Sequence, residues 1–158
     1  MVRSSHIIDL DADACVPDFI WSDACPKDHP SRQISVARHR RIGRLAWDPS
    51  KLWLYRAIKQ TDSNPIYGHH LWDRDLVYRH VLNANVLDYL LTHQELIPPE
   101  WKNYEVYFWG TTYKDCNTPP RFQVRYVTWD WELDEWQSWS RGLNSFWNNN
   151  MPAAILDF

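Results

Sequence analysis

The spacing of apolar residues divides the chain into a helical middle and a strand-rich end. Between residues 72 and 101 apolar residues recur at the intervals of three and four that are typical of amphipathic helices. From residue 103 the interval changes to two, as in strands whose side chains alternate between the faces of a sheet. The pattern predicts an α+β fold, with an antiparallel sheet packed against two short helices.

The middle segment predicts two helices. Asp73 is placed to cap the first helix. The residues at helical spacing along one side of this helix are Leu76, Val77, His80 and Val81. Asn85 is placed to cap the second helix, which should end before Pro98 because a residue preceding proline avoids helical geometry. The buried stripe of this second helix consists of Val86, Leu87, Leu90 and Leu91.

The C-terminal part predicts a meander of three strands, at 103–109, 121–131 and 135–143. A turn at 132–135 places Trp131 opposite Trp136. One face of the sheet then holds Arg125, Val127, Trp129, Trp131, Trp136, Ser138 and Ser140. The other face holds Phe122, Val124, Tyr126, Thr128, Trp139 and Arg141. A turn shifted by one residue would exchange the two faces.

The second of these faces is more continuously apolar, so it is expected to form the core and to bury Trp139. The first face is then the expected binding surface. Its candidate protein-binding residues are Trp129, Trp131, Trp136 and Arg125. Aromatic residues and arginine are the types that dominate protein interfaces, which favours this assignment.

The N-terminal segments predict an irregular acidic arm at 1–30 and a single domain at 31–158. Within the domain, an N-terminal hairpin is expected from strands at 42–47 and 52–58 around the turn Asp48-Pro49-Ser50. The chain has 158 residues, which suits one domain, and its 11 tryptophans provide large side chains to bury. No apolar run is long enough to span a bilayer.

The net charge of −3 conceals a strong segregation along the chain. Residues 1–30 carry −4, whereas residues 31–59 carry +7. A nucleic-acid surface on the basic hairpin 38–56 is therefore one alternative, since arginines can pair with phosphates while an aromatic ring stacks on a base. Its residues would be Arg38, Arg40, Arg41, Arg44 and Trp47. Two other interpretations are a solvated edge strand and an acidic arm that folds over this basic segment.

Cysteine and histidine residues provide only loose candidates for chemistry. Three cysteines and no secretory signal predict free thiols and a cytoplasmic location. A zinc set would comprise Cys15, Cys25, His29 and His39, but it lacks the C-x2-C spacing of a zinc knuckle, so no metal or cofactor is predicted. His69, His70, Asp73 and Asp75 are better explained by a turn and a helix cap. A neighbouring carboxylate should keep the Cys116 thiol protonated, so it is not expected to be a nucleophile.

No phosphate-binding loop or nucleophile motif is present, and the chain has only 4 glycines. The sequence therefore predicts a non-catalytic binding module rather than an enzyme. Another protein is the expected partner, and nucleic acid and carbohydrate bound on tryptophan rings are the alternatives. No membrane is expected to be a partner, and no oligomeric state is predicted.

A resemblance covers roughly the second half of the chain. The segments "VLNANVLDYLLTHQELIPPEWKN", "VYFWGTTY", "FQVRYVTW" and "PAAIL" resemble a pattern found in hypothetical proteins of uncultured bacteria. The resemblance implies a self-contained α+β module, and it carries over no activity, partner or functional residue.

Overall fold

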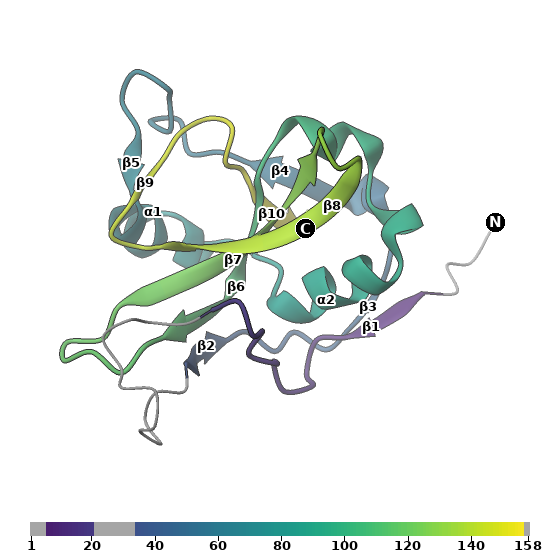
Figure 1. Cartoon of the computed structure of the whole chain (residues 1–158), viewed down its shortest axis with the longest axis horizontal. Coiled ribbons are helices and arrows are strands. Elements are labelled where there is room, and N and C mark those ends of the chain that lie inside the picture. Colours follow the sequence, from purple (N-terminus) through teal and green to yellow (C-terminus); the bar gives the residue numbers. More distant parts are fainter. Residues whose placement is uncertain (1–5, 21–33, 157–158) are drawn as a thin grey trace.

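The computed structural model describes residues 6–20 and 34–156 and folds them around a six-stranded sheet (Figure 1). The strands of this sheet are β2 (Ser35–His39), β4 (Leu52–Tyr55), β6 (Val106–Lys114), β7 (Phe122–Asp130), β8 (Glu135–Gly142) and β10 (Ala153–Leu156). Their order is β4-β10-β6-β7-β8, and β2 also pairs with β6. Only the β10–β6 pair is parallel among these described strands.

Two small sheets and several short helices complete the fold. The small sheets pair β1 (Ile7–Asp9) with β3 (Arg44–Ala46), and β5 (Ile66–Tyr67) with β9 (Phe146–Trp147). The α-helices are α1 (Gly68–Arg74) and α2 (Ala84–Thr92). The 3-10 helices are η2 (Pro49–Lys51), η3 (Leu76–Tyr78), η4 (Gln94–Leu96) and η5 (Pro99–Asn103). The predicted α+β class is confirmed, and none of the described helices has the length and apolar character needed to cross a membrane.

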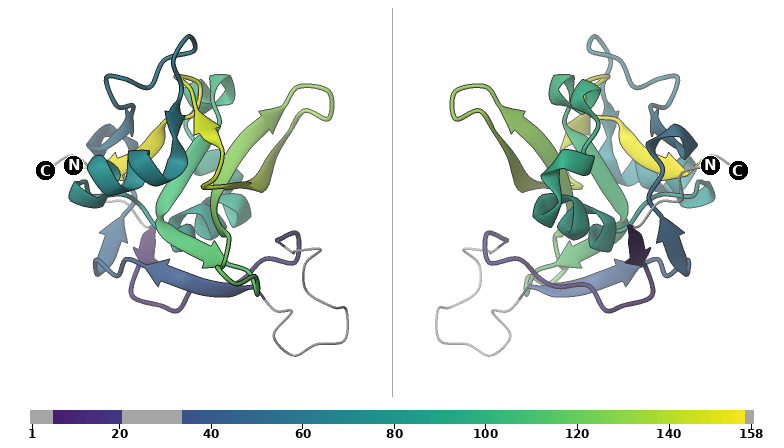
Figure 2. Two further views of the ribbon diagram at one scale, coloured as in Figure 1. Left: turned by 90° about the vertical axis from the view of Figure 1, so that its left-hand side faces the viewer. Right: turned by 90° about the vertical axis from the view of Figure 1, so that its right-hand side faces the viewer.

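Strand β6 lies inside the sheet and is buried on both faces. Every residue from Val106 to Tyr113 is buried. Because strand side chains alternate, Val106 and Phe108 join a hydrophobic cluster with α2, whereas Tyr107 and Trp109 join a second cluster with α1. Figure 2 shows the two helices on opposite sides of the sheet. The sheet therefore separates two cores.

Each helix begins earlier than the sequence pattern predicts. α1 ends at Arg74, so Asp73 lies in its last turn and does not cap a helix at Leu76. The segment after η3 is extended because Val81 bridges Ile155 of β10, a long-range pairing that overrides the local helical spacing.

The cap of helix α2 also lies two residues before the predicted cap, Asn85. It is capped by Asn83, whose side chain accepts a hydrogen bond from the backbone of Asn85. The predicted stripe is confirmed at Val86, Leu87 and Leu90, which are fully buried.

The predicted N-terminal hairpin is wrong, although both of its strands exist. β3 pairs with β1, and β4 pairs with β10. The residues predicted to form the hairpin turn instead begin η2, where the Asp48 side chain accepts a hydrogen bond from the backbone nitrogen of Ser50. The two strands thus belong to different sheets.

The predicted irregular arm is also wrong at residues 7–9, which form β1. Ile8 and Leu10 are buried in the core, and Arg41 forms an ion pair of 2.6 Å with Asp13. Arg41 also donates to the carbonyl of Asp11. The alternative in which the arm folds over the basic segment is therefore confirmed for residues 7–20, while residues 21–30 lie outside the described residues.

The C-terminal meander of β6, β7 and β8 is confirmed, but its last turn lies one residue earlier than predicted. Trp129, rather than Trp131, is paired with Trp136, and Trp139 is paired with Tyr126. Moving a four-residue turn by one residue moves the strand register by two, so the predicted division into faces is preserved. The expectation that such a shift would exchange the faces is therefore wrong.

The assignment of the core to the Trp139 face is wrong at β8. Trp139 is 47% exposed, whereas Trp136 is 8% exposed. Trp136 packs into the α2 cluster, while Trp139 makes an edge contact with Phe19 at 5.8 Å. Both faces of the sheet are covered at β6, but at the edge strand β8 the face beneath α2 buries its tryptophan and the other face leaves Trp139 half-exposed.

We expect Trp136→Ala to lower the free energy of unfolding by about 3–5 kcal/mol, because it removes a large buried ring. Trp139→Ala should cost about half as much or less, because nearly half of that side chain is already in water. Chemical denaturation of the two variants measures the difference. Equal losses would show that Trp139 is as deeply packed as Trp136.

We also expect Gly110→Ala to be destabilising by about 1–3 kcal/mol, because overpacking forces the backbone to shift. A Cβ atom on Gly110 would lie 2.7 Å from the backbone nitrogen of Asn83. Gly142→Ala is the matched control, since the nearest atom to its Cβ would lie 3.8 Å away. Denaturation curves in which the two alanine variants are equally stable would contradict this expectation.

Candidate functional site

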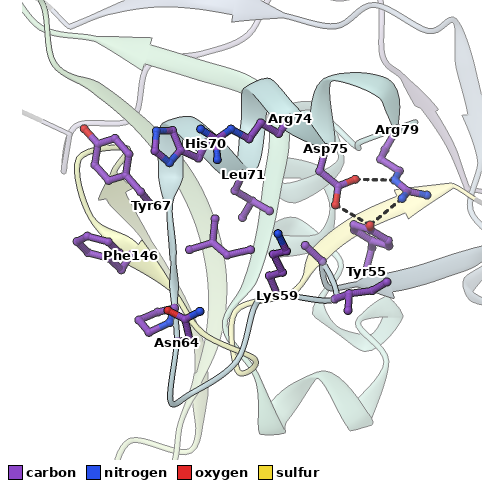
Figure 3. A pocket seen from close by; sticks show the side chains of 14 residues that line it. Tyr55, Lys59, Asn64, Tyr67, His70, Leu71, Arg74, Asp75, Arg79 and Phe146 are labelled. Carbon is purple, nitrogen blue, oxygen red and sulfur yellow. Dashed lines mark hydrogen bonds and ion pairs between the residues drawn. The ribbon is translucent and has the colours of Figure 1, made fainter.

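A cavity of about 790 Å³ opens between α1, the end of β4 and the β5–β9 pair. We name it the Tyr55 pocket, and Figure 3 shows its lining. Its apolar walls are formed by Ala57, Ile58, Pro65, Ile66, Tyr67, Leu71 and Phe146. Its charged or titratable groups are Tyr55, Lys59, His70, Arg74, Asp75 and Arg79. Ligand sites are commonly apolar cavities of this size with a few polar groups.

The sequence positions these walls through one close contact. A Cβ atom on Gly68 would lie 2.4 Å from the ring of Trp147 and 2.6 Å from the carbonyl oxygen of Leu143. Only glycine therefore allows α1 to begin directly against β9. The helix then presents Leu71 and Arg74 to the pocket, since residues three apart share a helical face.

Tyr55, Asp75 and Arg79 form a closed network at one side of the pocket (Figure 3). The Tyr55 hydroxyl donates to Asp75 at 2.7 Å, and Arg79 donates to Asp75 at 2.9 Å and to the Tyr55 hydroxyl at 2.7 Å. The Arg79 guanidinium also lies 4.2 Å from the centre of the Tyr55 ring. The network fixes all three side chains and neutralises Asp75.

The network also holds the proton on Tyr55. Burial, together with the hydrogen bond to Asp75 and its charge, raises the pKa of Tyr55 from 10.0 to about 12. The hydrogen bond that Arg79 itself donates to Asp75 raises the pKa of Arg79. Tyr55 is therefore a neutral hydrogen-bonding group at physiological pH and not a base or nucleophile. The arrangement is suited to binding.

Lys59 and Arg74 provide positive charge that this network does not compensate. Neither side chain forms a hydrogen bond or ion pair with any described residue. Lys59, Arg74 and Arg79 carry three positive charges and Asp75 carries one negative charge, so the lining has two positive charges in excess. An apolar cavity with this excess favours a ligand that combines an apolar group with a carboxylate or another anion.

The predicted protein-binding residues do not form one exposed surface. Trp131 is 69% exposed, but Trp136 and Arg125 are buried and Trp129 is partly buried. Arg125 forms an ion pair of 2.8 Å with Asp88 and donates to Ser138. Of the predicted set, only Trp131 is largely open to a partner.

The predicted nucleic-acid residues are mostly engaged inside the fold. The guanidinium groups of Arg38 and Arg40 lie 3.8 Å and 5.1 Å from the centre of the Trp72 ring. Arg41 pairs with Asp13 and Trp47 is buried, while exposed Arg44 lines a second cavity of about 470 Å³. These side chains do not form a continuous basic face.

The residues of the loose zinc set are separated or lie outside the described part of the chain. Cys25 and His29 are outside the described residues. Cys15 is exposed, and the His39 ring contacts the hydroxyl of Thr111 at 2.7 Å and the carbonyl of Ala12 at 2.9 Å. Within residues 6–20 and 34–156, no three potential ligands of the His, Cys, Asp or Glu type are grouped for a metal ion.

His69, His70, Asp73 and Asp75 occupy α1 and the residue that follows it. His70 and Asp75 line the Tyr55 pocket, while the His69 ring contacts Asn144 at 3.2 Å. Asp73 is exposed and caps no helix, so its predicted capping role is wrong.

Cys116 is disulfide-bonded, which corrects the prediction of free thiols at this position. The expectation that it is not a free nucleophile agrees with this bond. Disulfides are usual in oxidising compartments, so the cysteine content no longer supports the cytoplasmic prediction.

Sequence patterns did not indicate the Tyr55 pocket. Its lining comes from residues 55–79 and from Phe146, and the sequence pattern predicts no helix or strand in the segment 59–68. A possible signal was the concentration of Lys59, His70, Arg74 and Arg79 around apolar residues. These residues identify a cavity only in the folded chain, where β9 places Phe146 beside them.

We expect the folded-state pKa of Tyr55 to be lower in Asp75→Asn than in the parent, because the hydrogen bond to a charged acceptor is lost. Ring-carbon NMR titration measures this change.

Between pH 10 and 12 the folded parent keeps the Tyr55 proton and the unfolded chain releases it, so this group makes the stability fall as pH rises. In Tyr55→Phe, the free energy of unfolding should therefore fall less between pH 10 and 12 than it does in the parent. Chemical denaturation at several pH values measures this, and an equal fall in both proteins would contradict the raised pKa of Tyr55.

Comparisons with family models, curated proteins and solved structures found no match to this chain. Its function is therefore inferred from the chemistry of its own surface. The Tyr55 pocket combines an apolar cavity, a fixed hydrogen-bonding network and two cationic side chains without a described partner.

Proposed function

We propose that this chain is a non-catalytic binding module, and that the Tyr55 pocket binds a segment of another protein that carries acidic and apolar side chains. The observation that carries the proposal is the position of Lys59 and Arg74 beside the apolar walls of the pocket. An apolar side chain of the ligand would contact those walls, while its carboxylates would pair with the two cations.

Exposed apolar side chains around the pocket favour a protein segment over a small molecule. Ile58 is 98% exposed and Phe146 is 53% exposed, and both line the opening. Tyr78, next to Arg79 of the network, is 80% exposed. Exposed apolar groups that extend beyond a cavity are typical of surfaces that bind proteins.

Nucleic acid receives less support from the described contacts. Arg38 and Arg40 stack on Trp72, and Arg41 is neutralised by Asp13. A phosphate backbone would have to displace these contacts before it gained its own. Arg38, Arg40 and Arg41 are thus engaged within the chain, whereas Lys59 and Arg74 are available to a ligand.

An array of immobilised short peptides that vary in acidic and apolar content tests the proposal. The parent protein should select peptides in which a carboxylate neighbours an aromatic or aliphatic residue, and binding should weaken as salt increases. Lys59→Glu/Arg74→Glu should reduce this binding at least tenfold, because both replacements repel the carboxylates.

The control is Lys114→Glu, which makes one such charge reversal at an exposed position outside the pocket. It should leave the selected peptides unchanged. Selection that survives the double charge reversal, or a preference for basic peptides, would contradict the proposal.

A further inference from the structure

The turn between β7 and β8 forms an exposed tip with a composition opposite to that of the Tyr55 pocket. Trp131 is 69% exposed and Leu133 is 62% exposed. Four of the six residues from 130 to 135 are acidic and none is basic. Figure 2 shows this turn projecting from the body of the protein. We name residues 130–135 the hairpin tip.

The hairpin tip is held in shape by its own hydrogen bonds. The Asp130 side chain accepts from the backbone nitrogens of Glu132 at 2.9 Å and Leu133 at 3.0 Å. The Trp131 ring makes an edge contact with Trp129 at 6.3 Å, and the latter ring is covered by Lys102. A segment that is already ordered loses little conformational entropy on binding.

The hairpin tip and the Tyr55 pocket are complementary in two independent properties. Each offers exposed apolar groups, Trp131 and Leu133 on the tip and Ile58 and Phe146 at the pocket. Their charges are opposite, since the tip carries four carboxylates and the pocket has two positive charges in excess. The tip therefore has the composition of the ligand proposed above.

The two surfaces lie apart within one chain. Both views of Figure 2 place the hairpin tip away from α1, which forms one wall of the pocket. The tip is also fixed by the pairing of Asp130 with Glu135 and by the Trp129–Trp131 contact. A tip can therefore meet a Tyr55 pocket only on a different molecule.

On these grounds we propose that the Tyr55 pocket binds the hairpin tip of a second copy of this chain. The inference rests on the proposed function of the pocket and names a specific occupant. Because the two surfaces differ, the contact is heterologous, and each chain retains one unused tip or pocket for a further copy. Association should thus be head-to-tail, increase with protein concentration and weaken in high salt.

Sedimentation velocity of the full chain, with two variants, tests this assembly. The tip variant is Trp131→Ala/Leu133→Ser, which changes exposed side chains, and the pocket variant is Lys59→Glu/Arg74→Glu. The parent should associate over the micromolar to millimolar range, and each variant alone should be monomeric. An equal mixture of the two variants should form dimers and nothing larger. The pocket variant contributes an intact tip and the tip variant contributes an intact pocket, so a dimer of the two has no intact surface left for a third chain.

Trp139→Ala and Lys114→Glu are the controls, and both should assemble as the parent does. A parent that stays monomeric, variants that still assemble, or a mixture that does not form dimers would each overturn the inference. The peptide array separates this failure from that of the proposed function. If acidic and apolar peptides bind the pocket of a chain that stays monomeric, only the second-copy occupant is wrong.

Discussion

The fold depends on the burial of both faces of β6. A strand with Tyr107 and Trp109 on one face and Val106 and Phe108 on the other cannot leave either face in water without exposing a large apolar area. One helix must therefore cover each face. The position of α1 follows from this requirement, and the Tyr55 pocket is the space between α1 and the segments that pair along the same side.

This two-sided burial also explains which parts of the sheet could be predicted from the sequence. The alternation of apolar residues correctly indicated three antiparallel strands, because it reflects local geometry. It could not identify the buried face at β8, because both faces of the inner strands are apolar. Trp136 and Trp139 differ in burial only because the tertiary packing against α2 reaches one of them.

Long-range pairing accounts for the errors in the N-terminal half. The turn signal at Asp48 was real, but it belongs to η2, and the strands on either side find partners elsewhere in the chain. β3 pairs with β1 from the supposed arm, and β4 pairs with β10 from the C-terminal end. Local residue preferences contain no information about such partners, since the competing pairings differ in contacts far apart in sequence.

Charge likewise can be counted from the sequence, but its partners depend on contacts between segments far apart in the chain. The sequence showed that residues 31–59 are strongly basic, but only the structure shows which cations are already compensated. Trp72 covers Arg38 and Arg40, and Asp13 pairs with Arg41, so the basic segment stabilises the fold. Lys59, at the end of that segment, lies instead beside apolar walls with no described partner. Where a cation is left uncompensated next to exposed apolar groups, an acidic ligand can bind without first displacing an internal contact.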